Sequence, residues 1–364
     1  MKIADVIKEI ENFAPPSLQE SYDNAGLIVG DRNLLLKGIL ICLDSIEAVV
    51  DEAIAKDCNL IVAHHPIVFA GLKRFNGNNY IERIIIKAIK NDIAIYAAHT
   101  NLDNVADGVN AMIARKIGLS NTKILRPKAN ILRKLHTYVP TDHLANIQDA
   151  IFKAGAGHIG NYDECSFSFE GKGSFRAGDH ANAFVGQKGQ RHFEPETKIE
   201  VIYPSYNERK VINALKLSHP YEEVAYDIIP INNKNESIGS GMIGELAYPM
   251  NELDFLNHLK KNMNVEVIRH TQLANKLISK VAVCGGSGSF LLNTAIGQSA
   301  DIFITGDFKY HQFFDAEDKI IIADIGHYES EQYTNELFYN LLKKKFSNFA
   351  LRITEINTNP IKYF

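Results

Sequence analysis

The sequence predicts an α/β fold in two parts: a discontinuous α/β core built on a parallel or mixed sheet, and an inserted ferredoxin-like (βαββαβ) α+β domain. Three observations predict it. Short apolar runs alternate with amphipathic segments near both ends of the chain, the middle of the chain follows a different order, and 364 residues suit two or three domains. We expect the core at 1–125 plus 241–364 and the insert at 126–240.

The N-terminal part alternates between strand and helix patterns. It begins with an amphipathic helix, because apolar residues recur at 3, 6, 7, 10 and 13. Apolar runs predict buried strands at 38–43, 59–65 and 93–99, and helical spacing follows at 46–55, 81–90 and 108–117. Continuous apolar strands between amphipathic helices are typical of a parallel sheet that is covered on both faces.

The C-terminal part repeats this alternation. Strands are predicted at 280–284, 301–305 and 319–324, and helices near 290–298, 312–317 and 330–345. The last run, 349–356, alternates between apolar and polar residues, which suits a strand at the edge of a sheet.

The middle segment has the order β-α-β-β-α-β, which is typical of a split βαβ or ferredoxin-like unit. Its strands are predicted at 135–139, 164–170, 198–203 and 223–229, and its helices at 144–154 and 208–217. We expect a glycine-rich loop at 171–190 and a linker at 232–244. The ends of such a unit lie close together, which permits insertion into an exposed loop of another domain.

Charge and cysteine content narrow the function classes. Lys plus Arg is 39 and Asp plus Glu is 43, a net charge of −4, so we do not expect nucleic acid as a partner. The four cysteines are widely spaced and suit a reducing compartment. No apolar stretch approaches the ~20 residues that span a bilayer, and the N-terminal helix lacks the apolar core of a signal peptide. We therefore expect a cytoplasmic protein without a membrane partner.

Histidines and carboxylates follow two strands of the N-terminal part. His64 and His65 end one strand, where neighbouring side chains point to opposite faces, so two ions are easier to bind than one. Alternatively, one histidine ends the strand and the other is exposed. After the next strand, Asp103 can bind a metal or stabilise a turn, and His99 can bind a metal or support a ligand.

A third cluster follows a strand of the C-terminal part. His327 and Glu331 are four residues apart, so on a helix they share one face, although Glu331 also suits a helix N-terminus by its charge alone. The carboxyl ends of such strands commonly form a binding site. The combined set of candidate metal ligands has no thiolate: His64, His65, Asp103, His327 and Glu331. It suits two divalent ions bridged by a carboxylate, and Zn, Mn, Fe or Co would all fit.

Other loops carry weaker signals. The glycine-rich segment 284–289 can hold an anion with its amides or form a tight turn. Asp307, Lys309 and His311 can contact a substrate, transfer protons or serve only as turn and helix-start residues. The segment 23–26 is typical of a turn, and Asp44 suits a helix cap slightly better than a place behind a metal ligand.

The core resembles the GTP cyclohydrolase I type 2 homologue family of dinuclear-metal proteins in five segments: SYDNAGLIVGD (21–31), IVAHHPIVF (61–69), AAHTNLD (97–103), ITGDFKYHQ (304–312) and DIGHYESE (324–331). The five candidate ligands fall on the metal-ligand positions of that family. The middle segment is similar to the PII-like or CutA-like insert of its longer members, through GHIGNYDECSFSFEGKGSFR (157–176) and HPYEEVAYDI (219–228).

The resemblance implies a toroidal homohexamer whose metal sites face an internal cavity, and an activity of the GTP cyclohydrolase type. Two functions follow as hypotheses. The first is a metal-dependent hydrolase of a nucleotide or another phosphate-bearing small molecule, in which His99 or His311 transfers protons. The alternative is a non-enzymatic metal-binding ring, acting as a scaffold, store or sensor, whose insert binds an effector.

Overall fold

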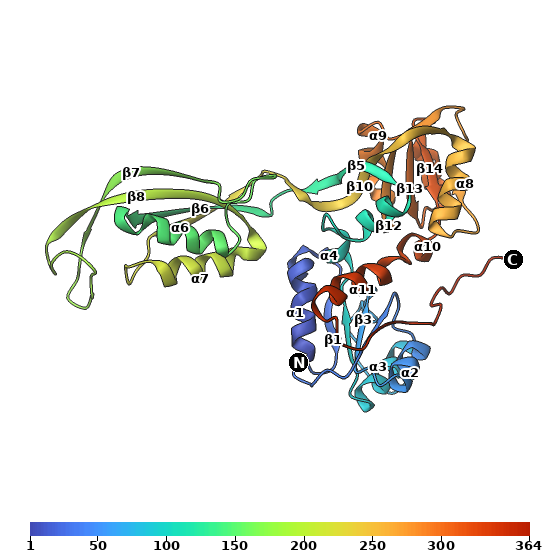
Figure 1. The fold of residues 1–364 in the computed structure, drawn as a ribbon, viewed down its shortest axis with the longest axis horizontal. Helices are drawn as coiled ribbons and strands as arrows, with labels where there is room; N and C mark the ends of the chain where they lie inside the picture. Colours follow the sequence, from blue (N-terminus) through green and yellow to red (C-terminus); the bar gives the residue numbers. More distant parts are fainter. The chain divides into compact units, whose positions relative to one another are not determined.

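The computed structural model describes residues 1–364, which fold into two compact units (Figure 1). The first unit contains Met1–Pro127 and Ser237–Phe364, and the second contains Lys128–Glu236. The first unit is built on two sheets and the second on one, so the predicted α/β class with an α+β insert is confirmed. None of the helices combines the length and the apolar character that crossing a membrane requires.

The first sheet carries the N-terminal strands. Its strands follow the order β1 (Gly26–Val29), β4 (Ala94–Ala97), β3 (Leu60–Ala63), β2 (Ile39–Cys42) and β15 (Leu351–Ile353). The last four of these are parallel, whereas β1, which the sequence analysis did not predict, pairs antiparallel with β4. The strand β15 occupies the edge, as its alternating pattern predicts.

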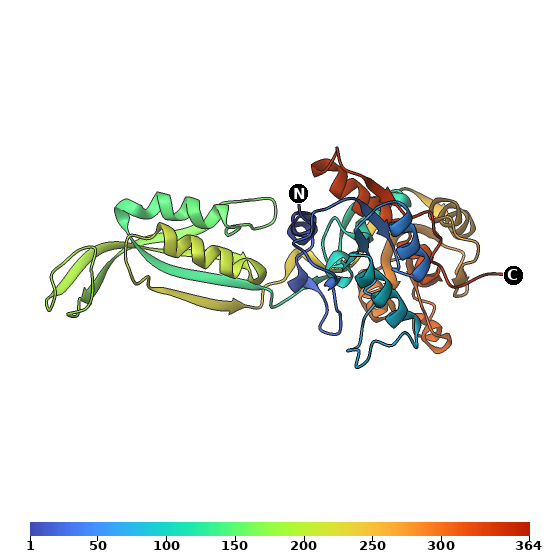
Figure 2. The same ribbon diagram turned by 90° about the horizontal axis from the view of Figure 1, so that it is seen from below.

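Helices cover both faces of this sheet, which explains why its central strands are apolar throughout (Figures 1 and 2). The helices α2 (Glu47–Ala55) and α3 (Tyr80–Lys90) form one hydrophobic core with β2, β3 and β4. On the other face, α1 (Ile3–Phe13) packs against α11 (Thr334–Lys345), which also contacts β2. The buried side chains of α1 are those of its predicted apolar face: Ile3, Val6, Ile7 and Ile10.

The second sheet carries the C-terminal strands. Its order is β11 (Arg269–His270), β14 (Ile321–Asp324), β13 (Ile302–Gly306), β12 (Leu277–Ser287), β10 (Asn235–Asn251) and β5 (Leu119–Lys128). The strands β12, β13 and β14 are parallel, whereas β10 pairs antiparallel with β12 and β11 pairs antiparallel with β14.

The predicted linker at 232–244 is wrong, because β10 begins at Asn235. The glycines that suggest a linker are instead places of close approach. A Cβ atom added to Gly239 would lie 2.1 Å from the carbonyl oxygen of Arg126. Glycine in this strand therefore permits two backbones to pack closely and does not indicate flexibility.

The remaining helices of the first unit differ in detail from the prediction. The segment 312–317 is a 3₁₀-helix, and 330–345 contains two helices that are separated at Gln332, whose side-chain amide donates to the carbonyl of Met263 at 2.8 Å. The elements are η1 (Pro16–Leu18), α4 (Thr100–Asp103), α5 (Val109–Lys116), α8 (Glu252–Met263), η4 (Ser289–Leu291), α9 (Leu292–Gly297), η5 (Tyr310–Ala316) and α10 (His327–Glu331).

The second unit has the predicted β-α-β-β-α-β order. Its elements are β6 (Leu132–Pro140), η2 (Thr141–His143), α6 (Leu144–Lys153), β7 (Ser166–Arg176), β8 (Arg191–Pro204), η3 (Ser205–Asn207), α7 (Glu208–Ser218) and β9 (Tyr226–Ile231). The sheet order is β7-β8-β6-β9 and all neighbours are antiparallel, which is the ferredoxin-like arrangement. Both helices cover one face of the sheet (Figures 1 and 2) and share a buried core with it.

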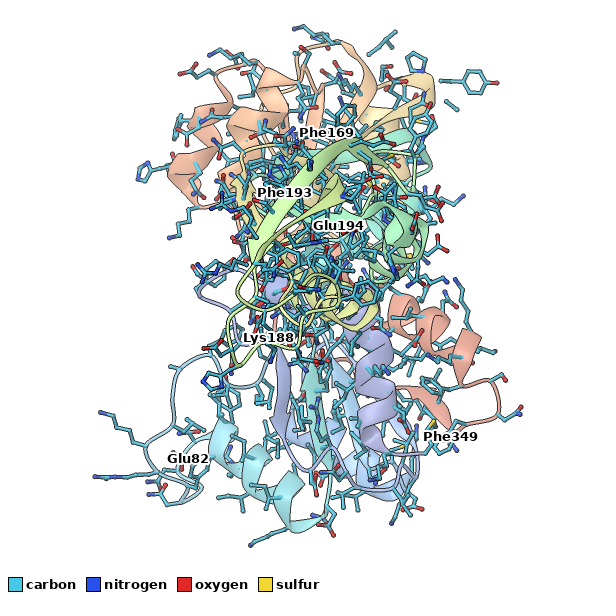
Figure 3. The ribbon with its side chains drawn as sticks, turned by 90° about the vertical axis from the view of Figure 1, so that its left-hand side faces the viewer. Glu82, Phe169, Lys188, Phe193, Glu194 and Phe349 are labelled. Carbon is cyan, nitrogen blue, oxygen red and sulfur yellow. The ribbon has the colours of Figure 1, made fainter.

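The hairpin of β7 and β8 is longer than predicted. The strand β7 continues to Arg176, so the expected glycine-rich loop begins only at residue 177 and extends to residue 190. Gly173 lies within the strand, where an added Cβ atom would lie 2.0 Å from a carboxylate oxygen of Glu196. Phe169 and Phe193 are exposed aromatic residues of this hairpin (Figure 3).

Candidate metal centre

The structure brings all five candidate ligands together within the first unit. His64 and His65 directly follow β3, Asp103 ends α4, and His327 and Glu331 are the two ends of α10. Glu331 lies at the centre of this cluster. Its Oε1 atom is 3.6 Å from Nε2 of His64, and its Oε2 atom is 2.9 Å from Nε2 of His65 and 3.1 Å from Nε2 of His327.

The ligand atoms fall into two groups that share Glu331. One group is His64, Asp103 and Glu331, the other is His65, His327 and Glu331, and the ligand atoms within each lie within 4.8 Å of one another. One carboxylate oxygen of Glu331 faces each group. The arrangement therefore suits a carboxylate that bridges two cations.

Two buried atoms of the cluster have no hydrogen-bond partner. They are Nε2 of His64, whose residue is fully buried, and Oδ1 of Asp103, which lies 3.7 Å away. Buried polar atoms in proteins are nearly always satisfied. A divalent cation between these atoms would satisfy both, and imidazole nitrogen with carboxylate oxygen is a donor set that such cations bind. The residues present therefore fit a metal ion.

The other ring nitrogens of His64 and His65 are held by oxygen atoms. Nδ1 of His64 donates to the carbonyl of Ala98 at 2.9 Å. Nδ1 of His65 donates to Oδ1 of Asp44 at 2.7 Å, and the second oxygen of Asp44 accepts from the hydroxyl of Thr358 at 2.6 Å. These contacts fix each imidazole so that Nε2 faces the cluster, as is usual for histidines that bind metals.

His99 and His327 follow the same rule. Nδ1 of His327 donates to Asp307 at 2.7 Å, and Nδ1 of His99 donates to Asp23 at 2.8 Å. The ligand atoms of His99 also lie near those of His64 and His65. The structure therefore brings His99 to the cluster, where it can bind a metal or handle a proton.

Sequence reasoning missed the role of Asp23 and ranked the role of Asp44 behind a metal ligand second. Asp23, predicted as a turn residue, has a fully buried side chain. Burial alone would raise its pKa, but hydrogen bonds from His99 and Thr100 outweigh burial and lower the pKa to about 2. Asp44, predicted slightly in favour of a helix cap, does not cap α2, whose N-cap is Ile46. Asp44 follows the end of β2, and Asp23 lies in the segment 21–31 that resembles the family. These positions were signals, but the histidines that the two residues hold are distant in the sequence.

Two amides of the glycine-rich segment are engaged by the protein itself and are not open to an anion. The amide of Gly285 donates to Oδ1 of Asn110 at 3.0 Å, and the amide of Gly286 donates to the hydroxyl of Ser330 at 2.9 Å. Gly286 has a φ of +60°, and a Cβ atom there would lie 2.4 Å from Oε1 of Glu331. The segment therefore gives Glu331 the space it needs.

His311 is not brought to the cluster. It is exposed on η5, and its ring packs against Tyr310 and Phe314, with centroid distances of 5.2 and 6.4 Å. Of the two candidate proton-transfer residues, only His99 lies beside the proposed ligands: its ring is 5.3 Å from that of His64 and 5.4 Å from that of His65.

The carboxylates of the cluster favour positive charge beside them, either as protons or as metal ions. Burial alone would lower the pKa of His65, but Asp44 and Glu331 outweigh it and raise the pKa to about 10. Glu331 and Asp307 likewise overcome burial and raise the pKa of His327 to about 9. Burial and the neighbouring Glu331 raise the pKa of Asp103. Metal ions would therefore compete with protons for this cluster.

A cavity of about 940 Å³ lies beside the cluster. His65, His99, Asp103, His327 and Glu331 are part of its wall. The rest of the wall is mainly apolar and comes from the loops after β3 and β4, from the glycine-rich segment and from the C-terminal residues 358–361. A small molecule in this cavity would meet the candidate metal ligands directly.

Comparison with known proteins gives the family. A model of Duf34/NIF3 (NGG1p interacting factor 3) matches residues 1–360. The chain belongs to the Duf34/NIF3 family. A Bacillus subtilis relative named GTP cyclohydrolase 1 type 2 homolog is 38% identical and aligns over 98% of this chain and 97% of its own. A Staphylococcus aureus relative with the same name is 36% identical over the full length of both chains. The family predicted from the five segments is confirmed.

Solved structures of the Duf34/NIF3 family share the fold. The crystal structure of a Bacillus cereus protein related to NIF3 is 38% identical, covers 100% of this chain and 99% of its own, and has a TM-score of 0.87. A Staphylococcus aureus structure has a TM-score of 0.79 at 33% identity, with coverage of 100% and 99%. The similarity therefore includes the insert as well as the core.

Proposed function

We propose that this protein binds two divalent metal ions per chain and acts as a metal-dependent hydrolase. The observation that carries the proposal is the central position of Glu331, with one carboxylate oxygen toward each group of ligand atoms and a cavity beside both. The proposed ligands are the five residues predicted from the sequence: His64, His65, Asp103, His327 and Glu331. Zn, Mn, Fe and Co all suit these donors.

The chemistry divides between the ions and the chain. Bound divalent ions lower the pKa of a coordinated water and polarise an electrophile. The chain holds the imidazoles in place through Asp44, Asp307 and the carbonyl of Ala98. His99, whose Nδ1 is held by Asp23, presents its other nitrogen beside the cluster and is the better candidate for proton transfer.

The proposed substrate is a nucleotide or another phosphate-bearing small molecule. The cavity has the size of a small-molecule site, and the curated relatives carry the name GTP cyclohydrolase 1 type 2 homolog. A turnover screen of metal-loaded protein over nucleotides and phosphoesters tests the proposal, with His64→Ala as the control. We expect at least one substrate to be hydrolysed by the wild type and not by the variant. Absence of turnover with all four metals would contradict the hydrolase.

The alternative is a non-enzymatic metal-binding ring whose insert binds an effector. The observation that favours it is the second unit, which has its own core and contributes no residue to the metal cluster. We propose a homohexamer for either function, and light scattering of the metal-loaded protein tests it by mass. A chain that binds metal without any turnover, and whose insert binds a small molecule, would favour this alternative.

A further inference from the structure

We infer that the cavity binds a flat, largely apolar molecule with a single metal-binding head group, such as one phosphate or carboxylate, and discriminates against polyphosphates. The inference rests on the proposed metal site and narrows its substrate class. It concerns binding alone, so it can fail or hold independently of turnover.

The first observation is the absence of lysine and arginine from the wall of the cavity. Its wall contains four carboxylates, those of Glu20, Asp44, Asp103 and Glu331, and no lysine or arginine. Polyphosphates are usually bound by arginine and lysine side chains or by open backbone amides. The guanidinium of Arg126 lies 4.7 Å from the ring centroid of Phe290 and is not part of the wall.

Two backbone amides of the wall that would suit an anion are already engaged by the protein. The glycine-rich segment is the part of the wall best suited to hold an anion, but Asn110 and Ser330 already accept from its amides at Gly285 and Gly286. The proposed metal ions are then the groups of the wall that carry the positive charge an anionic group needs. Two neighbouring ions can take one phosphate or carboxylate head group, whereas further phosphates would lie against carboxylates.

The charge around the proposed ions leads to the same conclusion. Five carboxylates bind or support the cluster, so they more than neutralise the charge of two divalent ions: Asp23, Asp44, Asp103, Asp307 and Glu331. The site therefore has no surplus of positive charge to attract a polyanion. The affinity for a substrate with one anionic group is little reduced by these carboxylates, because that group binds the ions directly.

The second observation is a set of exposed aromatic rings in the wall. Phe69, Phe290 and Tyr22 are 57%, 51% and 70% exposed, and all three line the cavity. The ring of Phe69 packs edge-on against His99, with 5.8 Å between centroids. An aromatic body bound beside the head group would cover such rings, which favours its binding through apolar contact. Phe69 is the wall residue that links this apolar surface to the cluster.

Two pairs of probes separate the contributions of the body and the head group. Phenylphosphonate and methylphosphonate share a head group and differ by an aromatic ring, whereas GMP and GTP share a base and differ in phosphate number. Calorimetry with metal-loaded, full-length protein measures the dissociation constants, and elemental analysis after each titration shows whether a probe has removed the metal. We expect phenylphosphonate to bind at least about tenfold tighter than methylphosphonate, and GTP to bind no tighter than GMP.

Phe69→Ala tests the aromatic wall directly. It should reduce the preference for phenylphosphonate at least threefold and leave metal content and methylphosphonate affinity unchanged. The matched control is Phe169→Ala, which removes an exposed aromatic ring from the insert (Figure 3) and should change none of these quantities.

Three results would overturn the inference: equal affinity for the two phosphonates, GTP more than tenfold tighter than GMP with the metal retained, or no binding of any probe to the metal-loaded protein. The proposed hydrolase fails separately, if probes bind as expected and no substrate is turned over. Turnover of a polyphosphate that binds tightly would contradict the inference and leave the hydrolase in place.

Discussion

The histidines of the chain divide between the two units but behave differently in each. Six of the 13 belong to the second unit: His136, His143, His158, His180, His192 and His219. None of these belongs to a group of three or more side chains that could hold a metal ion. In the first unit, four histidines converge and each has Nδ1 held by an oxygen atom.

The difference lies in whether several imidazoles share one carboxylate. In the second unit, His192 pairs with Glu194 two residues away, and His219 has both ring nitrogens bonded to backbone groups. In the first unit, His65 and Glu331 come from elements far apart in the sequence. The number of histidines therefore says little about a metal site. Several imidazoles that are oriented from behind and share a carboxylate in front are what distinguish it.

Removing the shared carboxylate should weaken metal binding by the first unit more than any other single change. In Glu331→Gln, one neutral amide replaces the charge that faces both groups of ligand atoms. We expect metal affinity to fall by about 100-fold or more, with at least one ion lost, while the fold persists. Elemental analysis and circular dichroism of the metal-replete protein measure the two outcomes.

The matched control for this variant lies in the insert. Glu200→Gln removes a carboxylate that accepts from Lys134 and Lys198 and faces His136. It should retain full metal content. Glu329 is a less suitable control, because it is buried and accepts from the side chain of Asn359. Equal metal content in Glu331→Gln and Glu200→Gln would show that Glu331 is not a ligand.

Removing a carboxylate behind a histidine should have a smaller effect. Asp44→Asn and Asp307→Asn each keep the shape of the side chain and weaken the bond that orients His65 or His327. We expect each to lower metal affinity by about 10- to 100-fold. Competition with a chelator measures this affinity.

Glu194→Gln is the matched control in the insert, because Glu194 lies 2.7 Å from Nε2 of His192. It should leave metal affinity unchanged. If the aspartate variants also bind metal as the wild type does, orientation by a carboxylate is not what distinguishes the histidines of the first unit.

The sequence predicts the ligand set better than the residues that support it. His64, His65 and Asp103 are visible because they follow neighbouring strands of the first sheet, and His327 and Glu331 because they follow β14 of the second sheet. The supporting residues belong to no such pattern. Asp23 precedes β1, a strand that was not predicted, and Asp44 is also held by Thr358 near the other end of the chain.

The strands, too, are predicted where a local pattern determines them and missed where distant contacts do. Buried apolar strands such as β2, β3 and β13 are predicted almost to the residue, because their burial on both faces leaves a clear pattern. The strand β10 is missed, since close packing against another backbone requires glycine and glycine otherwise indicates a loop. Tertiary contacts decide such positions, and a single sequence does not display them.

Replacing the insert should leave metal binding by the first unit intact. The second unit has its own core and supplies no candidate ligand, so exchanging residues 128–236 for a short Gly/Ser linker should leave a folded core. We expect metal affinity to stay within about threefold of the wild type. Metal titration and thermal unfolding of the shortened chain measure the outcome. Aggregation together with loss of metal binding would show that the core depends on the insert.

The two units shift the pKa of their histidines in opposite directions, and we expect a small effect of pH on the stability of the insert. Carboxylates raise the pKa of His65 and His327, whereas burial lowers the pKa of His219 in the insert. His219 is satisfied in its neutral form: Nε2 donates to the carbonyl of Tyr138 at 3.0 Å, and Nδ1 accepts from the amide of Tyr221 at 3.1 Å. A second proton would remove the acceptor.

The direction of the pH effect follows from this lowered pKa. As pH falls below about 6.5, the ordinary pKa of histidine, the unfolded chain takes up a proton that the folded insert resists, so the free energy of unfolding decreases until the folded pKa is passed. Hydrogen exchange of peptides from 128–236 in the full chain, measured at pH 7 and pH 5 after correction for intrinsic rates, should show this loss of protection. His219→Gln keeps a donor and an acceptor without titrating, so its loss should be smaller, while His158→Gln, at an exposed position, should behave as the wild type. If His219→Gln and the wild type lose equal protection on acidification, His219 does not account for the pH dependence of the insert.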